Sequence, residues 1–222
     1  IDNSSVEIGV SPVEELSLEK VKKRALFGIA ALTGRTALLQ LVALFSTFLL
    51  TIFLSPTQYG VFFLVSAVIN FFAYFADIGL AAALIQKKKH PTEEELKTTF
   101  TIQQGLVLVL VSIIFVATPI FQRVYGLSDQ SVHLLWALTI SLILSSLKTI
   151  PSVLLERGLK FEKLIVPQIV ETVLFYLVAV TMAWKGFGIT SFTFAVLVRG
   201  ISGLVAMYLL SPWKPGFAFT KD

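Results

Sequence analysis

Six long apolar segments divide the chain, and each is long enough to cross a lipid bilayer. A transmembrane helix needs about 20 consecutive, mostly apolar residues, and the polar stretches between these segments are short enough to join antiparallel neighbours. The segments are Ala25 to Leu54, Tyr59 to Gln86, Thr98 to Phe121, Val132 to Leu155, Leu164 to Trp184 and Phe187 to Leu210. A composition of 55% hydrophobic and 14% charged residues fits a membrane solvent. The sequence therefore predicts an all-α integral membrane protein with six transmembrane helices.

The basic residues lie between the apolar segments rather than along one polar face, which argues against a nucleic-acid partner. The chain has no cysteine and only two histidines, His90 and His133. Disulfides, thiolate catalysis and a sulfur-ligated metal are therefore excluded. We expect no metal and no cofactor.

The distribution of positive charge predicts the orientation in the membrane. Thirteen of the 18 Lys and Arg flank the segments on one side, and positive charge marks the cytoplasmic side. They are Lys20, Lys22, Lys23, Arg24, Lys87, Lys88, Lys89, Lys97, Arg157, Lys160, Lys163, Lys214 and Lys221. The opposite side has only Arg123 and Lys185. We therefore predict a multi-pass protein of the inner (cytoplasmic) membrane with both termini in the cytoplasm.

The same pattern predicts three regions. Residues 1–24 read as a cytoplasmic tail with a short interfacial helix, because their apolar residues are loosely spaced along one helical face beside basic ones. Residues 25–211 form the six-helix transmembrane region. Residues 212–222 form a cytoplasmic end.

The stretch from Asn70 to Phe100 shows how one span ends and the next begins. Its apolar part contains Asp77 and ends at a block of three lysines, Lys87 to Lys89. Thr92, with Glu95 three residues later, matches a capping box, the pattern that begins a helix. We therefore expect a new membrane helix to start on the side where the previous one ended.

Five ionisable residues lie inside the apolar segments, at similar depth. They are Arg35, Asp77, Lys148, Glu171 and Arg199. Each lies about 8 to 12 residues from the expected cytoplasmic end, which is about 12 to 18 Å along a helix. Charges at such depth are costly and mark functional sites by default.

Two interpretations of these charges stay open. They could pair with one another as structural contacts between helices. Alternatively, three cations and two acids could line a hydrated cavity of net charge +1, suited to an anionic head group, with Asp77 and Glu171 relaying a proton or ion. The segment Thr98 to Phe121 has no ionisable residue and offers only Gln104 and Ser112 for a polar face, so we expect it to face mostly lipid.

Four motifs resemble those of a known family. They are LSPTQYGVF at Leu54 to Phe62, FADIGLAAALIQ at Phe75 to Gln86, LLERGLKFEKL at Leu154 to Leu164 and GFGITSF at Gly186 to Phe192. Their sequence and order are similar to polysaccharide biosynthesis proteins of the multidrug/oligosaccharidyl-lipid/polysaccharide flippase superfamily. This group includes the Wzx-type oligosaccharide flippases.

The resemblance implies one lobe of a two-lobe flippase fold, with a central cavity that is often cationic. The six expected helices correspond to the N-terminal lobe, cut before a second lobe. The missing lobe or a second copy of the chain would then be a partner, besides membrane lipids and polysaccharide polymerase machinery. Whether the chain is a fragment or a half-size transporter stays open.

The function implied by the resemblance is translocation of a polyprenyl-pyrophosphate-linked oligosaccharide for cell-surface polysaccharide synthesis, by alternating access. In this interpretation Arg35, Lys148 and Arg199 bind the substrate, while Asp77 and Glu171 couple an ion or pair with the cations. The protein would be a transporter and not an enzyme. The alternatives are an exporter of a drug or another lipid in the same superfamily, a membrane enzyme, or an assembly subunit of polysaccharide synthesis.

Overall fold

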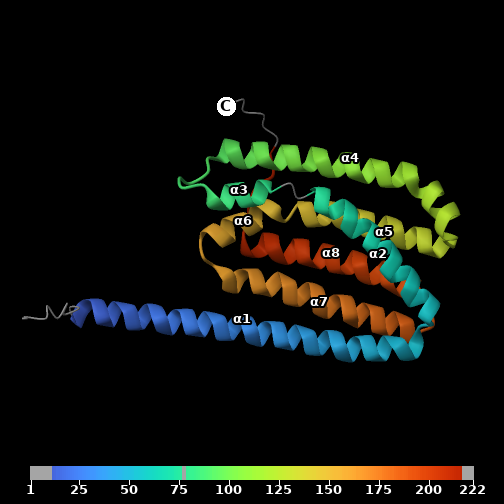
Figure 1. Ribbon diagram of the computed structural model, residues 1–222, viewed down its shortest axis with the longest axis horizontal. Coiled ribbons are helices and arrows are strands. Elements are labelled where there is room, and N and C mark those ends of the chain that lie inside the picture. Colours follow the sequence, from blue (N-terminus) through green and yellow to red (C-terminus); the bar gives the residue numbers. More distant parts are fainter. Residues whose placement is uncertain (1–11, 77–78, 217–222) are drawn as a thin grey trace, which may run out of the picture. The chain divides into compact units, whose positions relative to one another are not determined.

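The computed structural model describes residues 12–76 and 79–216, and within these ranges the chain forms eight α-helices and no β-strand (Figure 1). Side chains are described from Thr33 onward. The helices are α1 (Pro12–Phe53), α2 (Pro56–Ala76), α3 (Leu80–Gln86), α4 (Glu93–Tyr125), α5 (Asp129–Ser146), α6 (Thr149–Arg157), α7 (Phe161–Trp184) and α8 (Thr190–Leu210). The predicted all-helical class is confirmed.

The chain divides into two compact units, residues 1–41 and 42–222, each of which is described by itself. The described part of the first unit is the beginning of α1. This helix starts at Pro12, where the missing proline N–H is no loss, and runs without a break past Arg24. The expected boundary between residues 24 and 25 therefore lies inside one helix, and the division into three regions stays a prediction.

Within residues 12–76 and 79–216, five helices are long and apolar enough to span a membrane, and a sixth span results if α5 and α6 are counted together. The five are Thr33–Phe53 of α1, and all of α2, α4, α7 and α8. Large apolar side chains such as Tyr74, Val116 and Leu209 remain exposed on these helices, as expected where the solvent is lipid. The chain is thus a multi-pass membrane protein.

The predicted single helix from Val132 to Leu155 is wrong, because α5 and α6 meet at a bend of 40°. Pro151 has no N–H, so it cannot donate a helical hydrogen bond to the carbonyl oxygen of Leu147, four residues earlier. Tyr208 of α8 donates its hydroxyl to this oxygen instead, at 3.1 Å. A tertiary contact therefore satisfies the carbonyl that the break leaves free.

The predicted single helix from Tyr59 to Gln86 is also wrong. Helix α2 ends at Ala76, and α3 begins at Leu80 after Gly79, which has a left-handed backbone with φ of 79°. Glycine adopts this conformation without the steric cost that other residues meet. Residues 77 and 78 lie outside the described part of the chain.

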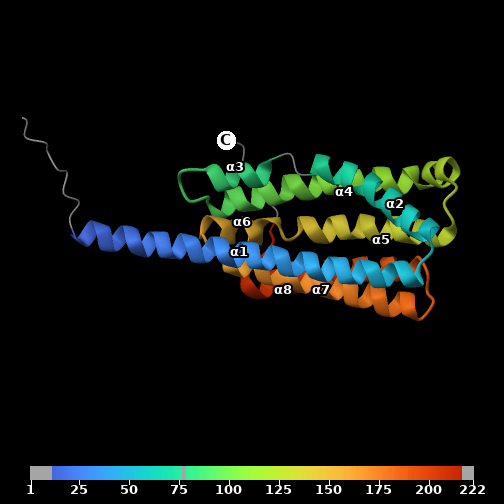
Figure 2. The same ribbon diagram turned by 60° about the horizontal axis from the view of Figure 1, so that its bottom comes forward.

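Two apolar clusters of described residues hold the helices of the second unit together. Figures 1 and 2 show these helices from two sides. The larger cluster joins α2, α4, α5, α7 and α8, and the most extensive helix pair is α7 with α8. The smaller cluster contains Leu84, Phe100, Ile150 and Trp213, which come from α3, the start of α4, α6 and the segment after α8. The two short helices α3 and α6 therefore pack together at one end of the bundle.

The expectation that the third apolar segment faces mostly lipid is wrong. In the most apolar window of α4, 28% of the residues are buried, as in α8, compared with 17% in α2 and in α7. Gln103 and Gln104 of this helix are both buried. Helix α4 packs against α5 and α2, and its polar pair faces protein.

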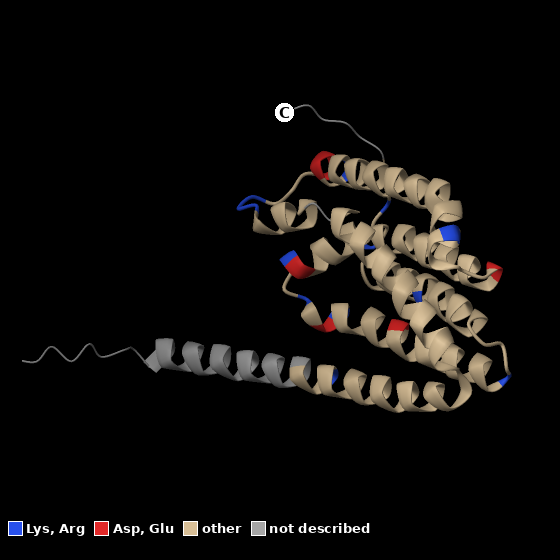
Figure 3. Ribbon diagram, turned by 45° about the vertical axis from the view of Figure 1, so that its right-hand side comes forward, with Lys and Arg blue, Asp and Glu red and all other residues tan. Residues whose placement is uncertain are grey.

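Charged residues of the second unit gather at helix ends and in the connections, and few lie along the helices (Figure 3). The α3–α4 and α6–α7 connections share one end of the bundle, while the α4–α5 and α7–α8 connections share the other (Figure 1). This alternation is what short connections between antiparallel membrane helices require.

Candidate functional site

A polar cavity of about 490 Å³ opens beside the bend between α5 and α6. Helices α3, α5, α6, α7 and α8 all contribute to its wall. Its polar lining consists of Ser145, Lys148, Thr149, Ser152, Glu156, Gln168 and Glu171. In a chain with this apolar surface, such a concentration of polar groups is the strongest candidate for a site.

The bend positions the central cation of this cavity. Lys148 precedes the first residue of α6, and its ammonium donates a hydrogen bond to the carboxylate of Glu171 on α7, forming an ion pair. Both side chains are only 14% exposed. A carboxylate this deep is compensated by the neighbouring cation.

Arg199 of α8 contacts the same carboxylate from another side. Its Nε lies 3.7 Å from the second oxygen of Glu171, and its side chain is 55% exposed. The guanidinium lies over the ring of Phe175, 5.8 Å from the centroid. Arg199 does not line the cavity. One acid thus contacts two cations, which gives the group a net charge of +1.

Gly203 provides the space that Glu171 occupies. A Cβ atom added at Gly203 would lie 1.8 Å from Oε1 of Glu171 and 2.4 Å from its Cγ and Cδ. The carboxylate therefore rests directly on the backbone of α8. The sequence alone gives no sign of this contact, because Glu171 lies on another helix.

Buried amides lie on the other side of the bend. Gln103 donates its side-chain amide to Thr149 at 3.0 Å, and Gln104 donates to Ser146 at 3.0 Å. A second cavity, of about 160 Å³, lies here, and its polar lining consists of Gln103, Ser145, Ser146 and Thr149. Two adjacent glutamines in an apolar segment were the sequence signal for this contact.

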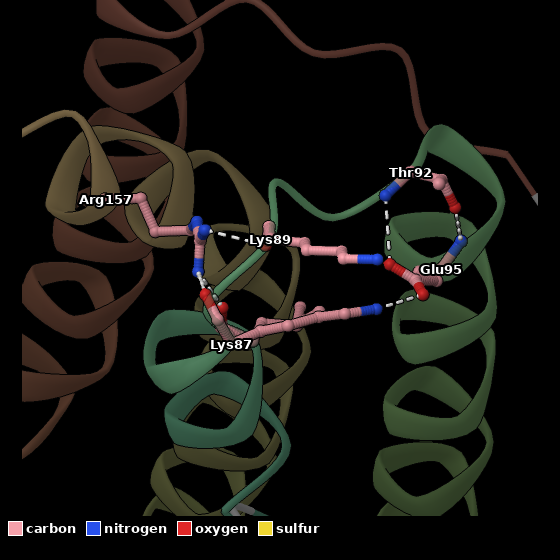
Figure 4. A network of polar contacts seen from close by, with 6 residues as sticks. Lys87, Lys89, Thr92, Glu95 and Arg157 are labelled. Atoms are coloured by element: carbon pink, nitrogen blue, oxygen red, sulfur yellow. Dashed lines mark hydrogen bonds and ion pairs between the residues drawn. The ribbon is translucent and has the colours of Figure 1, made fainter.

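An arginine fastens the end of α3 to α6 (Figure 4). Arg157 donates hydrogen bonds to the main-chain carbonyls of Leu84, Ile85, Lys87 and Lys89. Carbonyls at the end of a helix have no partner within it, so the guanidinium satisfies groups that α3 leaves free.

The start of α4 is fixed beside this contact. Thr92 and Glu95 form the predicted capping box, with Thr92 N donating to the Glu95 carboxylate at 3.0 Å and Glu95 N to Thr92 Oγ1 at 3.2 Å. Lys87 forms an ion pair with the same carboxylate. The capping-box prediction is confirmed.

Of the five charged residues singled out in the sequence, the structure brings Lys148, Glu171 and Arg199 together. Arg35 belongs to α1 in the first unit and is described separately from them. Asp77 lies outside the described residues. The assignment of substrate-binding and ion-coupling roles to these five residues stays a prediction.

Comparison with known proteins identifies relatives. The family model for polysaccharide biosynthesis proteins matches residues 49–222, well over half of the chain. The succinoglycan biosynthesis transport protein ExoT of Rhizobium meliloti (strain 1021) is 26% identical over 167 residues, which cover 75% of this chain. The chain spans only 33% of the length of that relative. No solved structure gives a significant match. The chain belongs to the polysaccharide biosynthesis protein family.

Proposed function

We propose that this chain takes part in moving a polyprenyl-pyrophosphate-linked oligosaccharide across the cytoplasmic membrane, for synthesis of a surface polysaccharide. The observation that carries the proposal is the group of Lys148, Glu171 and Arg199, which has net charge +1. Lys148 and Glu171 line a polar cavity inside a membrane protein, and Arg199 contacts the same carboxylate. The family and the similarity to a protein named for succinoglycan transport support a transporter over an enzyme.

The cations suit the pyrophosphate. Ammonium and guanidinium groups form charge-assisted hydrogen bonds to phosphate oxygens, which are stronger than bonds between neutral groups. Lys148 faces the cavity, and we assign it the first contact. Arg199 and Arg35 are further ligands in this proposal, while Asp77 and Glu171 orient the cations or couple an ion.

A second lobe completes the proposed transporter. Arg199 is 55% exposed in a helix that is otherwise suited to lipid, and a charged group facing lipid is unfavourable. A polar surface covering this side of α8 would remove that cost. We propose that a second lobe, in the same protein or from a second copy, provides this surface and that rocking of the two lobes gives alternating access.

Cysteine labelling tests the proposed orientation. We expect cysteines placed singly at Asp129 and Lys185 to react with a membrane-impermeant maleimide that reaches the outer face of an intact cytoplasmic membrane. Both positions are exposed, and they lie at the end of the bundle with few basic residues. Cysteines at Lys88 and Lys160 should react only after permeabilisation. The chain has no native cysteine, so the unmodified protein is the blank. External labelling at Lys88 would contradict the orientation.

Reconstitution tests the proposed transport. In proteoliposomes containing the protein that carries this chain, a fluorescent polyprenyl-diphosphate oligosaccharide should reach the opposite leaflet faster than in protein-free vesicles. Lys148→Gln should reduce the rate to that of the protein-free vesicles, while Lys160→Gln, an exposed lysine outside the cavity, should not. Equal transport of a lipophilic cationic drug and no transport of the diphosphate lipid would instead support the drug-exporter alternative.

A further inference from the structure

The carboxylate of Glu171 lies between Lys148, which lines the cavity with it, and Arg199, which contacts Glu171 from outside the cavity lining. One of its oxygens accepts the hydrogen bond from Lys148, and the other lies 3.7 Å from Nε of Arg199. An anion from outside that is to contact both cations must therefore replace this carboxylate. Glu171 is in this sense an internal competitor for the site.

The backbone of α8 holds the competitor in place. Gly203 lies four residues after Arg199, one turn along the same helix, and lacks the Cβ that would overlap Glu171 Oε1. Because this glycine has no side chain, the carboxylate rests against the backbone of α8 and not against a flexible side chain. Gly203, which makes room for the carboxylate, and Arg199, the second cation, therefore both belong to α8.

Competition by a fixed carboxylate discriminates between anions by charge. A phosphodiester head group carries one negative charge, as Glu171 does, so replacing the carboxylate by a phosphodiester gains little Coulomb energy and loses the fixed geometry. A pyrophosphate carries more charge and more acceptor oxygens, and it can contact both cations at once. This difference matters because a bilayer presents phosphodiester lipids to any cationic site in large excess.

We propose that Glu171, positioned by Gly203, is a specificity-determining counter-anion that excludes phosphodiester lipids from the cavity and yields to a pyrophosphate. The inference rests on the proposed function, since it assigns the cavity to a pyrophosphate-bearing lipid. It gives Glu171 a role in selection, besides balancing buried charge. It also makes Gly203 a positioning residue.

Competition binding tests this role. The probe is a fluorescent polyprenyl diphosphate, added to the protein in nanodiscs of phosphatidylcholine or in nanodiscs with part of that lipid replaced by phosphatidylglycerol. For the unaltered protein we expect similar affinity in both. For Glu171→Gln, which keeps the side-chain shape, phosphatidylglycerol should weaken probe binding by roughly tenfold, the scale of one lost charge interaction near a protein surface.

Gly203→Ala should reproduce this effect, because the added methyl group displaces the carboxylate. Gly200→Ala is the matched control: it is a buried glycine on the same helix whose added Cβ would meet the flexible end of Leu144, at 2.7 Å from Cδ1, and not Glu171. In a Glu171→Ala background, Gly203→Ala should have no further effect, since the group it displaces is gone. A purely structural role of Gly203 would lower thermal stability in both backgrounds without changing the sensitivity to phosphatidylglycerol.

The outcomes separate this inference from the proposed function. If the probe binds Lys148→Gln as tightly as the unaltered protein, the cavity is not the binding site of the pyrophosphate lipid. The counter-anion role of Glu171 is then excluded as well. Binding that requires Lys148 but is insensitive to phosphatidylglycerol in Glu171→Gln would overturn the counter-anion role alone. Because the Gln variant preserves shape, this second result holds even if Gly203→Ala fails to fold.

Discussion

Replacing Lys148 with glutamine is expected to abolish export of the lipid-linked oligosaccharide while the amount of protein in the membrane stays close to normal. Removing one member of a buried pair usually leaves an uncompensated charge, which costs about 3 to 5 kcal/mol. Here Glu171 keeps Arg199 as a neighbour, at 3.7 Å, and it lines a polar cavity. The remaining carboxylate is thus still compensated, so folding should tolerate the change.

The double variant Lys148→Gln with Glu171→Gln separates binding from pairing. If Lys148 serves only to neutralise Glu171, removing both charges should restore export, because no buried charge is left alone. If Lys148 binds the substrate, export stays lost at normal abundance. Surface polysaccharide and membrane protein level should be measured together in a strain that lacks its own transporter, with Lys160→Gln as the control. Recovery of export in the double variant would exclude a binding role for Lys148.

The membrane class and the approximate spans could be predicted from the sequence, because hydropathy reports directly on the solvent of each segment. The breaks within two spans could not. Pro119 and Pro167 also lie inside helices, α4 and α7, yet these helices continue, whereas Pro151 coincides with a bend. Part of the difference is tertiary: Tyr208 of α8 donates to the carbonyl that the bend at Leu147 leaves free. No pattern local to α6 contains that tyrosine.

The candidate site was predictable as a set of residues but not as an arrangement. Lys148, Glu171 and Arg199 stand out as charges in apolar segments, since charge there is rare. Which acid meets which cation depends on how α6, α7 and α8 pack, and Asp77 was an equal candidate in the sequence. The contact between Gly203 and the Glu171 carboxylate could not be predicted from the sequence, because a glycine in a membrane helix commonly serves close helix packing.

Replacing Arg157 with lysine should release α3 from α6 while leaving the rest of the bundle intact. The guanidinium donates to four main-chain carbonyls, those of Leu84, Ile85, Lys87 and Lys89. A lysine ammonium keeps the charge that orients the loop in the membrane but cannot reproduce the planar, five-donor geometry. Losing two of these charge-assisted bonds, at about 1.5 kcal/mol each, removes about 3 kcal/mol from the local stability of the α3 end.

Helix α3 has only seven residues and cannot hold its structure alone, so this loss should appear as faster amide exchange there. About 3 kcal/mol corresponds to roughly a hundredfold acceleration of amide exchange.

Hydrogen–deuterium exchange measured by mass spectrometry should show this acceleration in peptides covering residues 80–90 and not in α7 or α8. The matched control is Arg123→Lys, since Arg123 is exposed at the other end of the bundle and its side chain makes no hydrogen bond or ion pair with the described residues. Ala81, Ala82 and Ile85 of α3 line the main cavity, so export of the oligosaccharide should decrease when the amides of α3 lose their protection from exchange. Unchanged protection of residues 80–90 would mean that the apolar cluster around Leu84 and Ile150, and not the arginine, holds α3 in place.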